Sequence, residues 1–171
     1  MPLTREQLES ATQRLVDAQG EAERRNEWTF FVDSIYAPDS VYICEYAGTM
    51  LVKAEGREQI KATHYGRDMQ NWEGWTFPSQ GIYIGSDNRI INHWMNRGPG
   101  LRADGSYFET PGLSFIRFND AMQIEHQLDM FDLAHQMVLC DQLEAAGLLS
   151  AALKSSWVVP MKNKLKAALS V

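Results

Sequence analysis

The chain has 171 residues, 44% of them hydrophobic and 22% charged, with a formal net charge of -6 at pH 7. This length favours one domain around a single core, and the composition excludes a globally disordered chain. The negative charge excludes a general electrostatic attraction to nucleic acid or to anionic membranes, so we expect neither as a partner.

The cysteines and the N-terminal segment indicate where the protein works. Cys44 and Cys140 lie far apart and match no metal or disulfide spacing, which is typical of free thiols in a reducing compartment. The segment MPLTREQLESATQRL carries charges where a signal peptide needs an apolar core. No apolar run approaches the ~20 residues of a membrane span. We therefore expect a soluble, cytoplasmic protein.

The N-terminal part predicts two helices and a hairpin. Thr4 begins a capping-box pattern and apolar residues then recur at helical spacing, which predicts a first helix over residues 4–20. A second helix should run over about residues 21–36 and end before Pro38. The segments VYICEYAG and TMLVKAEG are rich in strand formers and predict a hairpin that turns at residues 47–49.

The pattern then changes from helical to alternating. GREQIKATHYGRDM predicts a third helix, QGIYIGSDNRIINHWMNR predicts two strands joined at residues 86–88, and SYFETPGLSFIRFNDAMQIEHQLDMF predicts two or three more. A helix over residues 133–147 and a last helical piece interrupted at Pro160 follow. This order predicts an α+β fold, in which a curved antiparallel or mixed sheet packs on N-terminal helices and extra helices follow at the C-terminus.

Three segments in this order, YAPDSVY, GREQI and IEHQLDMFDL, resemble the NTF2-like superfamily, in particular its SnoaL-like and limonene-epoxide-hydrolase branches. The resemblance covers roughly residues 10–135. It implies that residues 1–171 form a single domain, a cone-shaped half-barrel around a deep apolar pocket, with residues 148–171 as a helical extension. It also implies a homodimer, with a trimer as the alternative, and no cofactor. Members of the superfamily include isomerases, dehydratases, polyketide cyclases, epoxide hydrolases and non-catalytic binding modules, so the fold alone does not fix an activity.

The residues that differ from the epoxide hydrolases argue against their reaction. Those enzymes carry a Tyr-x-Asn, an Arg-x-Asp and a final-strand Asp, which fall here on Tyr42-x-Cys44, Trp94-x-Asn96 and Asp129. The Tyr and the final Asp are retained, whereas the Arg and its proton-donating Asp partner are replaced. The resemblance therefore implies a different acid–base reaction.

Asp129 is the expected general base. Strand periodicity places it on one face with Glu125, Gln127 and Phe131, and the resemblance turns that face toward the pocket. Apolar surroundings would raise its pKa and make it a stronger base. The alternative is a carboxylate that an arginine neutralises or that caps a helix. Asp132, three residues later, is instead expected to cap the following helix.

Tyr42 and His64 are the expected partners of that base. Tyr42 shares a strand face with Cys44 and Tyr46, and a phenol in a dry pocket can donate a hydrogen bond to a developing oxyanion. An aromatic residue that fills the core is the alternative for Tyr42, and Cys44 is expected to be a small buried filler. His64 would form an acid–base pair with Asp129, as pocket histidines do in scytalone dehydratase-like members, although a lone helical histidine is more often structural.

The other expected substrate contacts come from aromatic and amide side chains. Trp75 and Trp94 would form aromatic walls, although Trp75 is equally well explained as core. Asn92 and Asn96, on the strand face of Trp94, would anchor polar groups. The full set of expected substrate-binding residues is Cys44, Tyr46, Trp75, Asn92, Trp94, Asn96 and Gln127. Clustered metal-ligand spacings are missing, so we expect no metal.

The sequence thus predicts a cofactor-independent acid–base enzyme that acts on a hydrophobic, aromatic or polycyclic small molecule. A lyase that carries out elimination, dehydration or retro-aldol-type cleavage is favoured, with an isomerase or hydrolase of the same superfamily as the alternative. A non-catalytic ligand-binding or subunit-association module is the main rival, because Trp94-x-Asn96 makes the pocket less charged. The small subunit of an aromatic-ring dioxygenase is a third possibility.

Overall fold

The structure is a computed structural model that describes residues 2–46 and 50–170. Its centre is a six-stranded sheet with the strand order β2-β1-β6-β5-β4-β3. β1 and β6 run parallel, and the other neighbouring strands pair antiparallel. The strands are β1 (Tyr36–Tyr46), β2 (Met50–Glu55), β3 (Ser79–Ile84), β4 (Arg89–Leu101), β5 (Tyr107–Phe118) and β6 (Ile124–Phe131).

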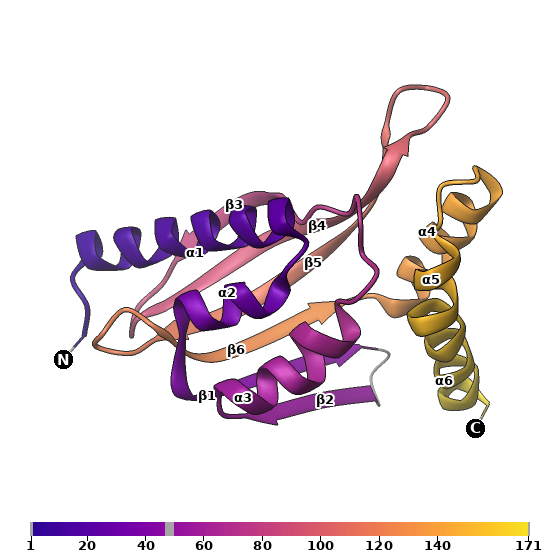
Figure 1. The fold of residues 1–171 in the computed structure, drawn as a ribbon. Helices are drawn as coiled ribbons and strands as arrows, with labels where there is room; N and C mark the ends of the chain where they lie inside the picture. Colours follow the sequence, from indigo (N-terminus) through magenta and orange to yellow (C-terminus); the bar gives the residue numbers. More distant parts are fainter. Residues whose placement is uncertain (1, 47–49, 171) are drawn as a thin grey trace.

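The helices form two groups around this sheet (Figure 1). The first group, which lies along one face of the sheet, is α1 (Arg5–Arg25), α2 (Trp28–Ile35) and α3 (Arg57–Ile60), the last continued by the π-helix η1 (Lys61–Asp68). The second group, which stands across one end of the sheet, is α4 (Leu133–Ala145), α5 (Ala151–Leu153), the π-helix η2 (Lys154–Val158) and α6 (Val159–Leu169). Helices and a mixed sheet in this order confirm the predicted α+β class.

The first two helices meet later in the chain than their sequence pattern predicts. α1 begins with the expected capping box at Thr4 but runs through Gly20 to Arg25. It ends at Asn26, whose left-handed backbone (φ 50°) lets its N–H bond the carbonyls of the preceding turn. The predicted boundary at residues 20–21 is therefore wrong, because one glycine inside a helix weakens the helix without ending it.

Pro38 lies inside β1 and does not form a break after α2. α2 ends at Ile35 as predicted, and β1 begins directly at Tyr36. The register between β1 and β6 shifts between Tyr36 and Val41, so the proline occupies an irregular stretch of the ladder, where its missing N–H is tolerated. The antiparallel pairing of β1 with β2 confirms the predicted hairpin, whose turn at residues 47–49 lies outside the described residues.

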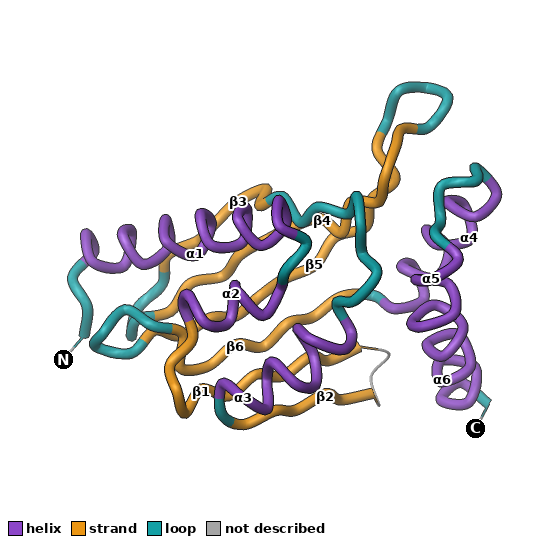
Figure 2. The backbone as a smooth tube through the Cα atoms, viewed as in Figure 1, coloured by secondary structure: helices purple, strands orange, loops and turns teal. Residues whose placement is uncertain are grey.

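The later strands follow the predicted turns (Figure 2). β3 and β4 are joined through Asp87 and Asn88, both with positive φ, as a tight hairpin between right-twisted strands requires. The predicted face of the last strand needs one correction at Glu125. A register shift pairs Phe118 with Ile124 and Arg117 with His126, so Glu125 is an extra residue and Ile124 is buried in its place.

The C-terminal helices contain one confirmed and one incorrect prediction. Asp132 caps α4, with its side chain accepting a hydrogen bond from the backbone N–H of His135 (3.1 Å). Pro160 does not interrupt the last helical piece, because it lies in the first turn of α6, directly after η2. Within residues 2–46 and 50–170, no helix combines the length and the apolar character that a membrane span requires.

Candidate active site

Four side chains form a row across the helix-covered face of the sheet. Asp129 on β6 is the register partner of Cys44 on β1 and of Ser114 on β5. Ser114 in turn pairs with Asn92 on β4. Directly paired residues point to the same side of a sheet, and all four are buried. The row confirms the strand faces predicted for Tyr42-x-Cys44 and for Asn92.

Asp129 is a buried carboxylate that accepts hydrogen bonds from three side chains. Its exposed fraction is 8%, and it accepts hydrogen bonds from the Ser114 hydroxyl (2.6 Å), the Gln127 amide (2.8 Å) and the Tyr42 hydroxyl (3.0 Å). Burial raises the pKa of Asp129 above its usual value, although the hydrogen bonds and the nearby His64 partly oppose the rise. The result is a carboxylate held in one position that is a stronger base than an exposed one.

The hydrogen-bond network continues beyond the direct partners of Asp129. Gln127 accepts a hydrogen bond from the Tyr36 hydroxyl (2.7 Å), which lies 3.0 Å from the hydroxyl of Tyr65. On the other side, the Trp94 indole N–H donates to the Ser114 oxygen (2.8 Å). Burial raises the pKa values of Tyr36 and Tyr65 well above their usual range, so both phenols stay protonated. Such a network fixes the orientation of each donor that reaches Asp129.

His64 lies beside Tyr42 at the edge of this network. The two rings stack with centroids 4.5 Å apart and an angle of 22° between their planes. The Nδ1 atom of His64 is 3.7 Å from an oxygen of Asp68, which is too long for a hydrogen bond but close enough for an ion pair when the imidazole is protonated. Burial alone would raise the pKa of Asp68, but His64 and Arg67 outweigh that effect and lower it.

His64 lies within the π-helix η1. A Cβ at Gly66 would collide with the backbone carbonyl of Lys61, five residues earlier. This turn of the π-helix therefore accepts glycine at position 66, whereas a larger residue would require the backbone to shift. Short π-helical segments occur frequently at functional sites, because they alter the direction of neighbouring side chains.

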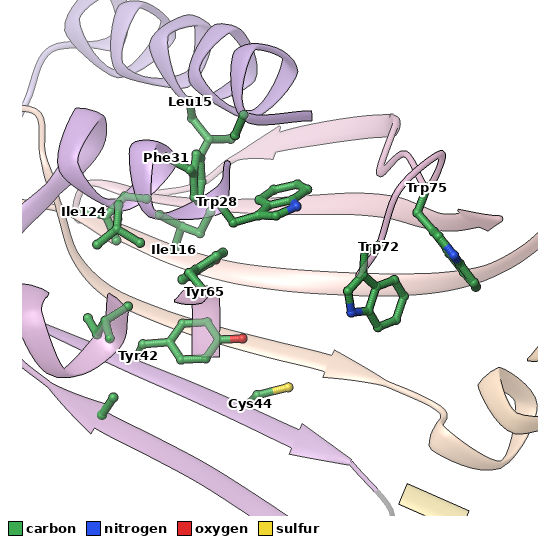
Figure 3. Close-up of a cluster of buried hydrophobic side chains, with 14 of the residues drawn as sticks. Leu15, Trp28, Phe31, Tyr42, Cys44, Tyr65, Trp72, Trp75, Ile116 and Ile124 are labelled. Atoms are coloured by element: carbon green, nitrogen blue, oxygen red, sulfur yellow. The ribbon is translucent and has the colours of Figure 1, made fainter. Parts of the chain in front are cut away.

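A cavity of about 100 Å³ lies between these groups and the N-terminal helices. Its polar lining comes from β1, β4, β5 and β6, from η1 and from Gln19 of α1, and its apolar lining is mostly aromatic. Figure 3 shows several of these side chains converging from different elements. The aromatic residues that line the cavity are Trp28, Phe31, Tyr42, Tyr65, Trp72, Phe77, Trp94, Phe131 and Trp157.

Most of the expected site residues line this cavity. They are Tyr42, Cys44, His64, Asn92, Trp94, Asn96, Gln127 and Asp129. Trp75 does not line it: this ring packs against Trp72 in a T-shaped pair with centroids 4.8 Å apart (Figure 3). The side chain of Tyr46 lies outside the described part of the chain.

Cys44 has the environment of a buried filler. Its thiol is 2% exposed, and burial, together with the charge of Asp129, raises its pKa far above the ordinary range. A thiol in this state carries no significant thiolate fraction near neutral pH and is a poor nucleophile.

Sequence reasoning missed Ser114, Tyr36, Tyr65 and Trp157. Counting residue pairs back from the turn at Asn119 would place Leu113 opposite Asp129, because the bulge at Glu125 shifts the register by one residue and brings Ser114 there instead. The tyrosines and the tryptophan reach the site from separate elements, and the sequence contains no local signal for their meeting.

The described residues hold no group of three or more His, Cys, Asp or Glu side chains placed to bind a metal ion.

Comparisons with known proteins establish the architecture. No protein-family model and no curated protein sequence matches this chain. A candidate isomerase of the SnoaL-like family from Agrobacterium tumefaciens superposes with a TM-score of 0.52 at 20% identity, over 74% of this chain and 97% of that one. An NTF2-like protein of unknown function from Burkholderia pseudomallei gives a TM-score of 0.54 at 16% identity, over 82% and 98% of the two chains.

A third solved structure, of TerC co-crystallised with polyporic acid, gives a TM-score of 0.57 at 15% identity, over 75% of this chain and 97% of that one. Identities at this level carry over the arrangement of helices and strands but not an activity or a substrate. With its mixed sheet, its N-terminal helices and these structural neighbours, the chain has the NTF2-like fold that SnoaL-like proteins share.

Proposed function

We propose that this chain is a cofactor-independent acid–base enzyme, a lyase that acts on a small hydrophobic aromatic molecule. The observation that carries this proposal is the environment of Asp129. A carboxylate is buried in an aromatic cavity, three donors hold it in place, and no lysine or arginine is among the described residues that line the cavity. A carboxylate with a raised pKa in a cleft is a candidate general base.

Asp129 would remove a proton from the substrate carbon next to a carbonyl group. Once it is protonated, the carboxyl group needs the hydrogen bond from Tyr42 less, and the Tyr42 hydroxyl becomes available to the substrate oxygen on which negative charge develops. Burial raises the pKa of Tyr42 well above its usual value, so this phenol acts as a hydrogen-bond donor and keeps its proton.

His64 would supply the proton that the leaving group needs. Its Nδ1 atom lies 3.7 Å from an oxygen of Asp68, and its stacking on Tyr42 places it beside the same cavity. In a dehydration, the electron pair of the broken C–H bond forms the new double bond, and the departing hydroxyl leaves as water with the proton from His64. Transfer of the proton from Asp129 back to His64 through solvent then restores the starting state.

The same groups would serve an isomerase if Asp129 returned its proton to another carbon of the substrate. The likeness in fold to a candidate SnoaL-like isomerase supports this second reading. A hydrolase is less well supported, because Trp94 and Asn96 stand where the epoxide hydrolases carry the Arg-x-Asp that assists epoxide opening.

The test is a turnover screen of single-ring aromatic alcohols and β-hydroxy ketones, followed by variants on the substrate that reacts. Asp129→Asn and Tyr42→Phe should each lower kcat by about 10²-fold or more, because general acid–base and oxyanion contributions have this size. His126→Gln, outside the cavity, is the matched control and should leave kcat unchanged. Unchanged turnover in both Asp129→Asn and Tyr42→Phe would refute the mechanism, and ligand binding without turnover of any compound would favour a binding module.

A further inference from the structure

We infer that the cavity takes a neutral, single-ring compound with a hydroxyl group, and that Asn92 is the residue that recognises this hydroxyl. The inference rests on the proposed function in one respect: it takes the cavity around Asp129 to be the substrate site, and it names the class of substrate. Its support comes from an unpaired amide, from the charges of the lining and from the size of the cavity.

Asn92 presents a buried polar atom without a partner. The side chain is 2% exposed, it lines the cavity, and no described residue donates a hydrogen bond to its Oδ1 atom. Leaving such a group unpaired in a protein interior costs about 1–3 kcal/mol. A ligand hydroxyl can remove this cost by donating to Oδ1. If the amide turns by 180°, the same hydroxyl can accept a hydrogen bond from the NH₂ group, so a hydroxyl pairs with either orientation.

The distance between Asn92 and the proposed general base, Asp129, suits a ligand with one ring. Ser114 is the register partner of both Asn92 and Asp129, so one strand separates the two residues. Neighbouring strands are about 4.8 Å apart, which puts the backbones of Asn92 and Asp129 on the order of 10 Å apart. A six-membered ring with one substituent spans the space that remains between two side chains at that separation.

The charges of the lining favour a neutral ligand. Asp129 and Asp68 both line the cavity, His64 is its one potentially cationic side chain among the described residues, and no described lysine or arginine reaches it. A carboxylate ligand would lose its hydration beside two acidic groups with no guanidinium or ammonium to compensate. A neutral hydroxyl avoids this penalty and still supplies the hydrogen bond that Asn92 lacks.

The volume limits the ligand to a single ring. A cavity of about 100 Å³ is smaller than the ~150 Å³ cavity that accommodates benzene in an engineered protein, and far below the ~300–1,000 Å³ of sites for larger ligands. Modest movement of the lining, for which the flexible side chain of Met69 is suited, would admit one ring. A polycyclic ligand would require Trp72 or Trp157 to leave the wall.

The experiment measures equilibrium binding of four compounds that share one benzyl or phenyl group and differ in a single substituent. They are benzyl alcohol, toluene, benzoate and benzylamine, titrated against the unaltered protein at pH 7 and followed by tryptophan fluorescence. Four tryptophans line the cavity and would report on occupancy. We expect benzyl alcohol to bind at least as tightly as toluene, although toluene leaves water more readily, and benzoate to bind about tenfold more weakly or worse. Tightest binding by benzoate or benzylamine would overturn the inference, because either would mean that the cavity selects a charge.

Asn92→Leu tests the role of the amide with a side chain of similar shape. The ratio of the toluene Kd to the benzyl alcohol Kd should fall by about fivefold in this variant, the value of one net hydrogen bond of about 1 kcal/mol. Thr110→Val is the matched control: it removes a buried hydroxyl on β5 that lies outside the cavity and donates to Gln136 of α4, and it should leave the ratio unchanged. An unchanged ratio in a folded Asn92→Leu protein would refute the assignment.

These binding measurements separate the inference from the proposed function. If the hydroxyl preference depends on Asn92 but no compound turns over, the recognition stands and the enzymatic proposal fails. If a substrate turns over in an Asp129-dependent reaction but binding ignores the hydroxyl, the enzymatic proposal stands and the recognition by Asn92 fails.

Discussion

Trp94 occupies the space above Gly112, its register partner on β5, where any other residue would carry its Cβ. The same indole donates a hydrogen bond to Ser114 (2.8 Å), and Ser114 donates one to Asp129 (2.6 Å). The missing side chain at position 112 thus helps to place an indole that in turn orients a donor to the buried carboxylate.

Gly112→Val should therefore displace the Trp94 ring and weaken its bond to Ser114. Overpacking of this kind costs about 1–3 kcal/mol, which urea unfolding would detect as a lower midpoint with a similar slope. Gly20→Ala is the control, because a Cβ there meets nothing within 4 Å and lies in the interior of α1. This control should raise the free energy of unfolding by about 0.5–1 kcal/mol. A Gly112→Val protein as stable as the parent would show that the ring adapts freely.

Much of the fold and part of the site could be predicted because their signals are local. Caps at Thr4 and Asp132 act within one helical turn, and strand alternation needs only neighbouring residues to place Asn92 and Trp94 on one face of their strand and Gln127 and Asp129 on one face of theirs. These predictions required no knowledge of which strands pair. That is why they hold despite errors in the boundaries of the helices.

The parts of the site that the sequence did not predict depend on contacts between distant segments. Ser114 meets Asp129 through the register of β5 and β6, and the bulge at Glu125 reverses the expected face of one residue. Tyr36 and Tyr65 come together from β1 and η1. Trp157 comes from beyond roughly residue 135, where the resemblance to the superfamily ends. No periodicity within one segment carries such information.

Asp132→Ala should distinguish the role of Asp132 from that of Asp129, the other acid of the LDMFDL segment. Loss of the α4 cap should lower the free energy of unfolding by about 0.5–2 kcal/mol, because one backbone donor of the first turn loses its acceptor. Asp132→Asn should restore most of that stability, since Asn caps about as well as Asp. Binding of benzyl alcohol, measured by titration, should be the same in all three proteins. Altered binding would place Asp132 in the site instead of at a helix end.

Asp129→Asn should change the dependence of stability on pH. Burial raises the pKa of Asp129 in the folded state, so the folded protein binds its proton more tightly than the unfolded chain does. This group therefore lowers stability as the pH rises above its unfolded pKa, with a slope of at most about 1.4 kcal/mol per pH unit up to the folded pKa. Above the folded pKa, the loss of stability caused by Asp129 is complete and no longer changes with pH.

Asparagine carries no such charge, and its carbonyl oxygen can still accept from Ser114 and Gln127. Asp129→Asn should thus gain stability relative to the parent as the pH rises through this window, and the difference should vanish at low pH. Urea unfolding at a series of pH values would measure it. A constant difference across that range would show that the carboxyl titrates alike in both states.

Trp157→Leu should enlarge the cavity on the side of the C-terminal helices. Trp157 lines the cavity and packs on Trp72 in a T-shaped pair with centroids 5.0 Å apart. Trp75 packs on the same ring at 4.8 Å but does not line the cavity, so Trp75→Leu is a matched control with a similar loss of aromatic contact. Both variants should lose stability, by about 1–4 kcal/mol, because a large buried ring is replaced by a smaller side chain. In Trp157→Leu alone, the affinity for 2-naphthylmethanol relative to benzyl alcohol should rise by about tenfold, since a second ring gains buried apolar area. An equal rise in Trp75→Leu would mean that general loosening, and not removal of the Trp157 wall, admits the larger ligand.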